Sequence, residues 1–211
     1  MAEITFWTNP MSRARIVRWM LEEVGADYET VVLNYGPEMK SDSYRAINPM
    51  GKVPAIRHQG VVVTEGAAIC AYLADAFPEA GLAPEPGSPE RGPYYRWLFF
   101  GAGPVEAAVT NASLGVKADT PELMGRVGYG SLKNVVDTLE AELQGREWFL
   151  GDRFSAVDVY LGAQIMWGVQ WGGIENRPAF GPYIERLKAR KAGERAKAAD
   201  DALMPAKPDA G

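Results

Sequence analysis

The chain has very few of the side chains that build metal centres and covalent cross-links. Its 211 residues contain one cysteine, Cys70, and one histidine, His58. A single cysteine excludes an internal disulfide and a cysteine-rich metal site, and a single histidine excludes a multi-histidine metal cluster. The same shortage argues against a Ser-His-Asp triad. We therefore predict a protein without a metal site.

The chain also has no excess of basic residues and no long hydrophobic run. The formal net charge is -5 and the isoelectric point is near 5.1, which argues against non-specific binding to nucleic acid. No run approaches the roughly 18 apolar residues of a transmembrane helix. The first 17 residues, "MAEITFWTNPMSRARIV", lack the apolar core of a secretory signal. These patterns predict a cytoplasmic protein with neither a membrane nor a nucleic-acid partner.

Residues 1–77 combine short apolar runs with amphipathic segments, which is typical of an α/β domain. The segment 11–25 carries apolar residues at helical spacing and stops at Gly25. A hairpin bend is expected near Gln59 and Gly60. The predicted strands cover 3–7, 28–34 and the hairpin 53–66, the predicted helices cover 11–25 and 66–77, and a polar connection occupies 36–51.

A segment dense in proline and glycine, 78–90, is predicted to be a linker. Beyond it we expect no strand, and 91–211 is predicted to be an all-helical domain. Gly101, Gly103 and Pro104 predict that its first helix is bent or broken. The predicted helices cover 94–115, 121–145, 155–170 and 178–191, and the tail after Ala192 is predicted to be frayed.

A proline at the start of a predicted strand, Pro54 in "NPMGKVPAI", needs an explanation. Proline forfeits a ladder hydrogen bond, so either it is simply the first residue of the strand or something else pairs with the backbone there. Two further motifs are "TEGAAICAYLAD" from Thr64 and "FLGDRFSAVDVYL" from Phe149. Together with the order of the two domains, these motifs resemble the cytosolic glutathione transferases of bacterial type over almost the whole chain.

This resemblance implies the fold and the chemistry. The expected fold is an α/β thioredoxin-like N-terminal domain followed by an all-α C-terminal domain. Glutathione is expected as a co-substrate, and no cofactor is expected. The resemblance also implies a homodimer, whereas it leaves the class of transferase open.

The resemblance further implies which residues contact glutathione. Pro54 is expected in the cis form, which turns the backbone of Val53 toward the cysteinyl residue so that glutathione pairs like an added strand. Glu65 and Gly66 open the next helix, whose amides and dipole suit the γ-glutamyl carboxylate. The family places serine where Gly66 stands, so only an amide is available there. Lys52 is the candidate for the glycyl carboxylate. The alternatives are a trans strand-start proline, a helix cap at Glu65 and a solvated lysine.

The position that stabilises the thiolate departs from the family pattern. Family members use a tyrosine at the end of the first strand, or a serine or cysteine in the turn after it. Here Trp7 occupies the tyrosine position and the turn has no cysteine. As hydrogen-bond donors to the thiolate we rank Asn9 first, Ser12 second and Thr8 third. The alternative for Ser12 is a helix N-cap.

Three other features are predicted to be structural. Cys70 lies in an apolar helix and is expected to be a small buried hydrophobe rather than a nucleophile. His58 lies in the hairpin bend and is expected at the surface. Ser155 and Asp158 have the spacing of a capping box, with aspartate in place of glutamate, and we expect them to stabilise the start of a helix.

Aromatic residues of the helical half supply candidates for a second binding site. Most of them are expected in the core or in a dimer interface. We expect one or two to line an apolar pocket for an aromatic or alkyl electrophile. The candidates are Tyr95, Phe99, Trp167 and Trp171.

The predicted function is glutathione S-transferase activity, in which the glutathione thiolate adds to a small hydrophobic electrophile during detoxification. One alternative is a non-catalytic glutathione- or ligand-binding protein of the same fold, because the expected tyrosine, cysteine and second-position serine are missing. Another alternative is a glutathione-dependent disulfide reductase. Ionisation of the bound thiol at neutral pH separates the transferase from the non-catalytic binding protein.

Overall fold

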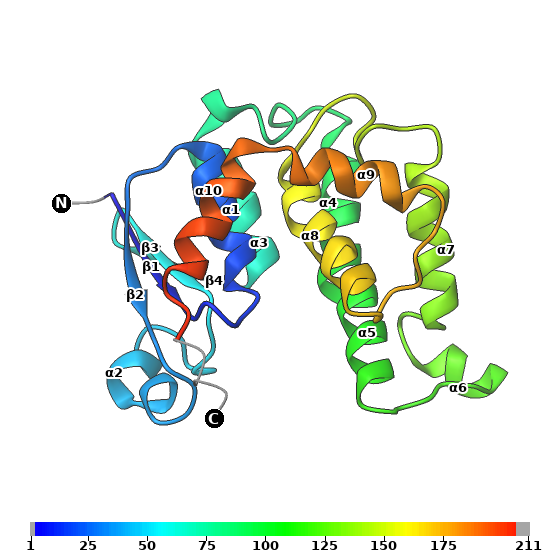
Figure 1. Cartoon of the computed structure of the whole chain (residues 1–211), viewed down its shortest axis with the longest axis horizontal. Coiled ribbons are helices and arrows are strands. Elements are labelled where there is room, and N and C mark those ends of the chain that lie inside the picture. The colour runs from blue at the N-terminus through cyan, green and yellow to red at the C-terminus, as the bar shows by residue number, and fades with distance from the viewer. Residues whose placement is uncertain (1–2, 206–211) are drawn as a thin grey trace, which may run out of the picture. The chain divides into compact units, whose positions relative to one another are not determined.

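The computed structural model describes residues 3–205, which form two compact units. The first unit contains the described residues up to Ile69 together with those from Arg190 onward, and the second is Cys70–Ala189. Helix α3 (Gly66–Ala76) spans the division. The first unit is a mixed α/β unit and the second is helical, which confirms the predicted fold class (Figure 1).

A four-stranded mixed sheet forms the centre of the first unit, with the strand order β2-β1-β3-β4. Strand β1 is parallel to β2 and antiparallel to β3, which is antiparallel to β4. Four of the five residues of β1 are buried, as its central place in the sheet requires. The strands are β1 (Ile4–Thr8), β2 (Tyr28–Val32), β3 (Ala55–His58) and β4 (Val61–Thr64).

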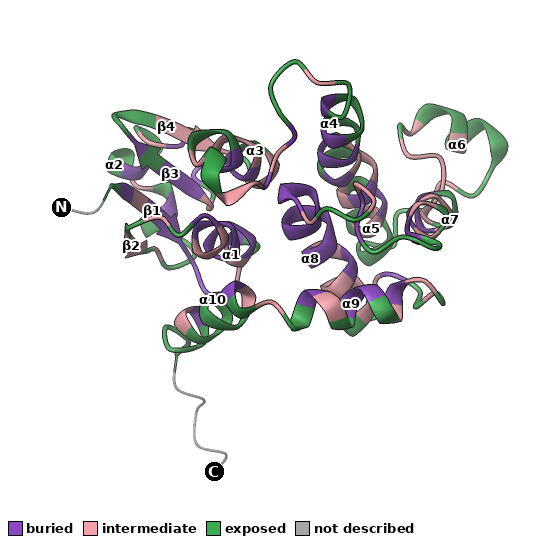
Figure 2. Cartoon of the chain, turned by 90° about the horizontal axis from the view of Figure 1, so that it is seen from above, coloured by how far each residue is buried: buried purple, intermediate pink, exposed green. Residues whose placement is uncertain are grey.

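The helices of the first unit include one from each end of the chain. Helix α1 buries an apolar face that includes Ile16, Val17 and Met20, and it stops at Gly25, whose φ is 67°. Helix α10 lies beside α1 (Figures 1 and 2). These elements are α1 (Ala14–Val24), the 3-10 turn η1 (Glu38–Lys40), α2 (Asp42–Arg45) and α10 (Lys191–Asp201).

Helix α10 corrects two predictions. The tail after Ala192 is helical to Asp201 rather than frayed, and it belongs to the first unit rather than to the helical domain. Its Ala192 and Ala196 are buried, so its packing on α1 supplies stability that its own composition does not predict. The rest of the predicted frayed tail, 206–211, lies outside the described residues.

The prediction that His58 lies at the surface is wrong. The bend does fall at Gln59 and Gly60, both of which have positive φ, but β3 continues through His58. The imidazole is only 3% exposed, and its Nε2 lies 3.0 Å from Oε1 of Glu3. The register of β3 with β1, in which His58 opposes Ile4, places it on a covered part of the sheet.

The second unit is built around an aromatic core. The ring of Phe149 lies 4.9 Å from that of Trp97 and 5.7 Å from that of Tyr183, between centroids. Its helices are the 3-10 turn η2 (Pro78–Ala80), α4 (Arg91–Phe100), α5 (Glu106–Ser113), α6 (Pro121–Arg126), α7 (Leu132–Leu143), α8 (Ala156–Gln170) and α9 (Phe180–Lys188).

Two predicted helices of this unit are interrupted. A π-helical turn, η3 (Gly101–Val105), holds Pro104 and joins α4 to α5 at the position where a bend or break is predicted. A Cβ on Gly101 would lie 3.0 Å from the Tyr160 ring, which explains a glycine here. The predicted helix 121–145 is divided into α6 and α7. Ser131 caps α7 by accepting a hydrogen bond from the Asn134 amide at 3.1 Å.

The predicted capping box at the start of α8 is confirmed. Oδ2 of Asp158 accepts hydrogen bonds from the backbone N–H and the hydroxyl of Ser155, at 2.9 and 3.1 Å. Its Oδ1 accepts from the Phe149 amide and the Tyr183 hydroxyl, both at 3.0 Å. The carboxylate therefore joins the start of α8 to a loop and to α9.

Candidate functional site

Three segments singled out in the sequence meet at one edge of the sheet. In the antiparallel ladders, Ala55 pairs with Trp7 on one side and with Thr64 on the other. The end of β1, the start of β3 and the end of β4 are therefore neighbours. We call this place the sheet edge; it is formed by 8–12, 52–54, 65 and 66.

The peptide bond between Val53 and Pro54 is cis, as predicted. The preceding carbonyl, that of Lys52, accepts hydrogen bonds from the Tyr44 hydroxyl at 2.7 Å and from Nδ2 of Asn48 at 2.8 Å. In a planar trans peptide the C=O and N–H point in opposite directions. The N–H of Val53 therefore points away from Tyr44 and Asn48.

Sequence reasoning missed the part that Tyr44 and Asn48 play here. Asn48 is 3% exposed, and its Oδ1 also accepts a hydrogen bond from the Met50 amide at 3.1 Å. Tyr44 packs with Trp7 and Ala55 in a buried cluster against which Val53 lies. Burial raises the pKa of Tyr44 to about 12, so its hydroxyl remains a donor. The only signal in the sequence was the asparagine in "NPMGKVPAI".

Glu65 turns the chain sharply from β4 into α3. Its φ is 67°, in the left-handed region that non-glycine residues seldom adopt. Its carbonyl accepts from the Ile69 amide at 2.9 Å and so closes the first turn of α3. The first amides of a helix have no partner within it, so those following Glu65, beginning with Gly66, are suited to an anion.

The turn between β1 and α1 is held by its own polar side chains. Asn9, 2% exposed, donates from Nδ2 to the Leu33 carbonyl at 2.8 Å and accepts at Oδ1 from the Met11 amide at 2.9 Å. Half-buried Ser12 donates from Oγ to the Asn9 carbonyl at 2.7 Å and accepts from the Ala14 amide at 3.1 Å. Thr8 is fully buried. Asn9 thus ties the turn to the end of β2, and Ser12 is the most accessible of the three predicted donors.

The electrostatics of this turn favour an anion. The first turn of α1 has no acidic residue, and Arg13 and Arg15 lie at its start. Nε of Arg15 donates to the Pro10 carbonyl at 2.5 Å. The positive end of the helix dipole lowers the energy of a negative charge placed here, while the charge of Arg15 is balanced by the Asp201 carboxylate, whose Oδ1 lies 2.8 Å from Nη1.

The residues predicted to line an electrophile pocket fall into two groups. On α4, Tyr95 packs edge-on against Tyr94 and Phe99 is largely exposed. At the end of α8, Trp167 and Trp171 stack with 5.9 Å between ring centroids, and Trp171 is exposed. Lys52, the predicted partner of the glycyl carboxylate, is also exposed.

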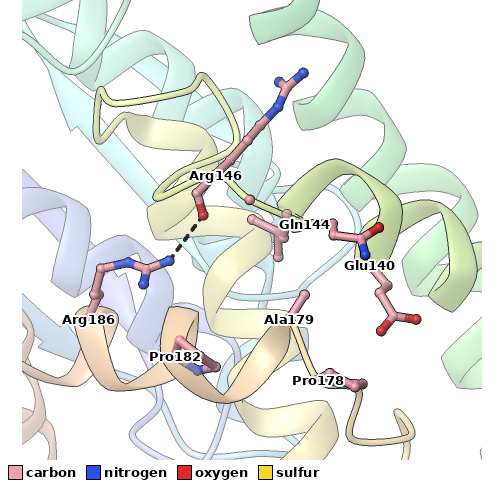
Figure 3. A pocket seen from close by; sticks show the side chains of 9 residues that line it. Glu140, Gln144, Arg146, Pro178, Ala179, Pro182 and Arg186 are labelled. Atoms are coloured by element: carbon pink, nitrogen blue, oxygen red, sulfur yellow. Dashed lines mark hydrogen bonds between the residues drawn. The ribbon is translucent and has the colours of Figure 1, made fainter.

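A pocket of about 380 Å³ lies elsewhere in the second unit, between the end of α7 and α9 (Figure 3). Its lining includes Glu140, Pro182 and Arg186, with Nη2 of Arg186 donating to the Arg146 carbonyl at 3.3 Å. None of the four predicted electrophile residues lines it.

Few of the described residues could take part in metal or redox chemistry. In the described range 3–205, no three His, Cys, Asp or Glu side chains are grouped so as to hold a metal ion. Cys70 is fully buried, as predicted, and burial raises the pKa of its thiol far above the ordinary value. Across the same described residues, no helix has the length and apolar character that crossing a membrane requires.

Comparisons with known proteins match both halves of the chain. Residues 10–76 match the model for the glutathione S-transferase N-terminal domain, and 106–167 match that for the C-terminal domain. Glutathione S-transferase GST-4.5 of Xanthomonas campestris is 30% identical over 161 residues, which cover 67% of this chain and 74% of that protein. Glutathione S-transferase GstA of Escherichia coli O157:H7 is 29% identical over 177 residues, which cover 81% of this chain and 85% of that protein. A sphingomonad glutathione S-transferase solved with glutathione aligns with a TM-score of 0.75 at 29% identity, covering 93% of this chain and 98% of that one.

Proposed function

Since the chain belongs to the glutathione S-transferase family, we propose that its sheet edge binds glutathione and activates the thiol. The protein is a glutathione S-transferase, with glutathione as its co-substrate. One observation carries the proposal for the site. The strand register brings the cis-proline segment, the start of α3 and the turn after β1 together.

Each part of the tripeptide has a partner at this edge. The oriented N–H of Val53 pairs with the cysteinyl backbone, so glutathione is added to the sheet as a short strand. The γ-glutamyl carboxylate accepts hydrogen bonds from the amides that begin α3 at Gly66, with Glu65 facing the α-ammonium group. Lys52 is exposed, and it pairs with the glycyl carboxylate.

For the thiolate, the structure favours Ser12 over the higher-ranked Asn9. Asn9 is buried, and both Nδ2 and Oδ1 of its side chain are already hydrogen-bonded to the backbone. Ser12, in contrast, is half-buried at the start of α1. The Ser12 hydroxyl can rotate from the Asn9 carbonyl toward the sulfur. The thiol proton passes to solvent, and the sulfur electron pair forms a bond to the electrophilic carbon. The displaced electron pair leaves with a leaving group or takes a proton from solvent.

The experiment is a titration of the ultraviolet thiolate band of glutathione bound to the purified protein. A free thiol has a pKa near 8.5, so a shift of about two units corresponds to about 2.7 kcal/mol of stabilisation of the anion. We expect the band of bound glutathione to appear near pH 6 to 7. In Ser12→Ala, the midpoint pH of this thiolate titration should return most of the way toward that of the free thiol.

Asn9→Ala and Thr8→Val complete the series. If Asn9 acts by shaping the turn, Asn9→Ala should weaken binding of glutathione as well as shift the midpoint. The matched control is Ser131→Ala, which removes a helix cap in the second unit and should leave the band unchanged. Binding without a shift in the wild type would contradict thiol activation, and no binding at all would overturn the assigned site.

The electrophile and the assembly are further parts of the proposal. The exposed aromatic side chains of α4 and α8 support an aromatic or alkyl electrophile, and detoxification in the cytoplasm is the role that this chemistry suits. We also propose a homodimer. Sedimentation at several protein concentrations tests the dimer, and turnover of a series of aryl and alkyl halides tests the electrophile.

The alternative functions have less support. Relatives named as glutathione S-transferases favour the transferase over a binding protein without activity. The only cysteine of the chain is buried with a raised pKa, which disfavours a disulfide reductase that works through a mixed disulfide with the protein.

A further inference from the structure

The two packed helices α1 and α10 carry charges in matching order. From the end of α1 toward its start, Glu23 pairs with Arg190 and Glu22 with Arg195, at 2.6 and 2.8 Å. The order continues with the pair Arg18–Asp200 at 2.7 Å and the pair Arg15–Asp201 at 2.8 Å. Late residues of α1 therefore meet early residues of α10, so the helices are antiparallel and four ion pairs fix their register.

Each helix places charge where its own dipole disfavours it. Helix α1 begins with arginines and ends with glutamates, and α10 ends with Asp200 and Asp201. Acidic groups stabilise a helix start and basic groups its end, so this arrangement is unfavourable for either helix alone. Paired antiparallel, the charges compensate each other. The pattern is thus explained by the pairing of the two helices.

One of these ion pairs leads directly to the turn after β1. The Arg15 guanidinium donates from Nη1 to Oδ1 of Asp201 and from Nε to the Pro10 carbonyl, at 2.8 and 2.5 Å. Pro10 lies between Asn9 and Ser12, the residues of the proposed thiol site. A second hydrogen bond to Asp201 comes from Lys197, one turn earlier in α10. The carboxylate is therefore fixed to α10 while it holds Arg15.

The neighbouring pair anchors the same end of α10 in the core. Arg18 and Asp200 are 2% and 1% exposed. Arg18 also donates from Nη1 to the Thr30 hydroxyl at 3.1 Å and to the Tyr28 hydroxyl at 3.3 Å, which ties it to β2. The end of α10 is thus held firmly enough to position Asp201 against Arg15.

From this chain of contacts we infer that Arg15 is a positioning residue of the transferase and that α10 controls it through Asp201. The Asp201–Arg15–Pro10 connection holds the turn in the geometry that presents Ser12 to the glutathione sulfur. This inference rests on the proposed function of the sheet edge. It gives the C-terminal helix a part in activating glutathione that is separate from its part in stability.

The test compares two exposed ion pairs between the same helices. Asp201→Ala removes the partner of Arg15, and Arg195→Ala removes the partner of Glu22 at the other end of α1. Both variants should lower the melting temperature by similar small amounts. Only Asp201→Ala should lower kcat/KM for glutathione, by about tenfold, and raise the midpoint of the thiolate band, because small displacements at a reacting centre are costly. Asp201→Glu should restore part of the loss.

A double-variant cycle shows whether Asp201 acts through Arg15. Arg15→Gln combined with Asp201→Ala should be no worse than Arg15→Gln alone, since both break one connection. Additive losses of kcat/KM in the double variant would overturn the inference. Equal activity of Asp201→Ala and Arg195→Ala would overturn it as well. A midpoint that falls in Asp201→Ala would also overturn it, because Asp201 would then act only as a negative charge.

The wild-type titration separates this inference from the function on which it rests. If wild-type protein shows no shifted thiolate band, the proposed function fails. If the band is shifted in the wild type and unchanged in Asp201→Ala, the proposed function stands and the role of α10 fails.

Discussion

At the scale of single residues, the direction of one peptide group decides how the sheet edge would meet glutathione in the proposed site. The Lys52 carbonyl is held by Tyr44 and Asn48, and this fixes the opposite direction for the N–H of Val53. Both partners come from the segment between β2 and β3, and neither of them contacts the ligand in our proposal. A supporting residue of this kind acts on affinity through orientation alone.

We predict that Asn48→Ala weakens glutathione binding about fivefold to tenfold. One of the two hydrogen bonds to the Lys52 carbonyl is lost, which corresponds to about 1 to 1.5 kcal/mol. Isothermal titration calorimetry measures the change. The matched control is Asn176→Ala at an exposed position of the second unit, which should leave the affinity unchanged. Equal affinities for wild type and Asn48→Ala would contradict the orienting role.

At the scale of elements, the start of α8 depends on a buried carboxyl group. Burial raises the pKa of Asp158 to about 6, while hydrogen bonds from Phe149, Tyr183 and Ser155 act in the opposite direction. The native pKa lies above the ordinary value of 3.8. The native state therefore holds a proton between these pH values that the unfolded chain has released. The stability that this group contributes is complete below about pH 4 and is lost as the pH rises through about 6.

Asp158→Asn tests this pH dependence. The variant should be less stable at every pH, because the amide nitrogen faces donors that now lack an acceptor. The difference in unfolding free energy between wild type and variant should narrow by about 1 kcal/mol from pH 5 to pH 7.5. Urea denaturation at both pH values measures it. A difference that widens with pH would mean that the four hydrogen bonds outweigh burial.

At the scale of the whole molecule, the only thiol reports on opening of the fold. Cys70 is fully buried on α3, and burial raises the pKa of its thiol, so the native protein presents no thiolate to a reagent. Modification of Cys70 then requires at least local unfolding of α3.

We predict that iodoacetamide modifies Cys70 at least on the order of a thousandfold more slowly in the native protein than in urea. S-methylglutathione, which has no free thiol, should slow the reaction further if the opening also destroys the sheet edge. At a hundred times its dissociation constant, the slowing should be about a hundredfold. Mass spectrometry follows the reaction. Fast labelling of native protein would contradict the burial of Cys70, and no effect of the ligand would show that α3 opens independently of the site.

Much of the fold was readable from local signals. Gly25 stops α1, Pro104 interrupts the long helix of the second unit, and Ser155 with Asp158 begins α8. Each signal includes an effect on backbone conformation or capping within a few residues of itself, and this local effect can be read without the tertiary structure. The role of His58 could not be read in this way, because its burial depends on pairing with a strand more than fifty residues away.

The sequence by itself determined the order of the strands and of most helices, because hydrophobic spacing and helix capping depend on neighbouring residues, and the resemblance that its motifs carry supplied the family and the cis proline. Only the tertiary structure decided which polar groups are accessible and what holds them. Asn9 is committed to Leu33, the Lys52 carbonyl is held by Tyr44 and Asn48, and Arg15 is held by Asp201 at the other end of the chain. Accessibility and hydrogen-bond partners depend on segments that only folding brings together.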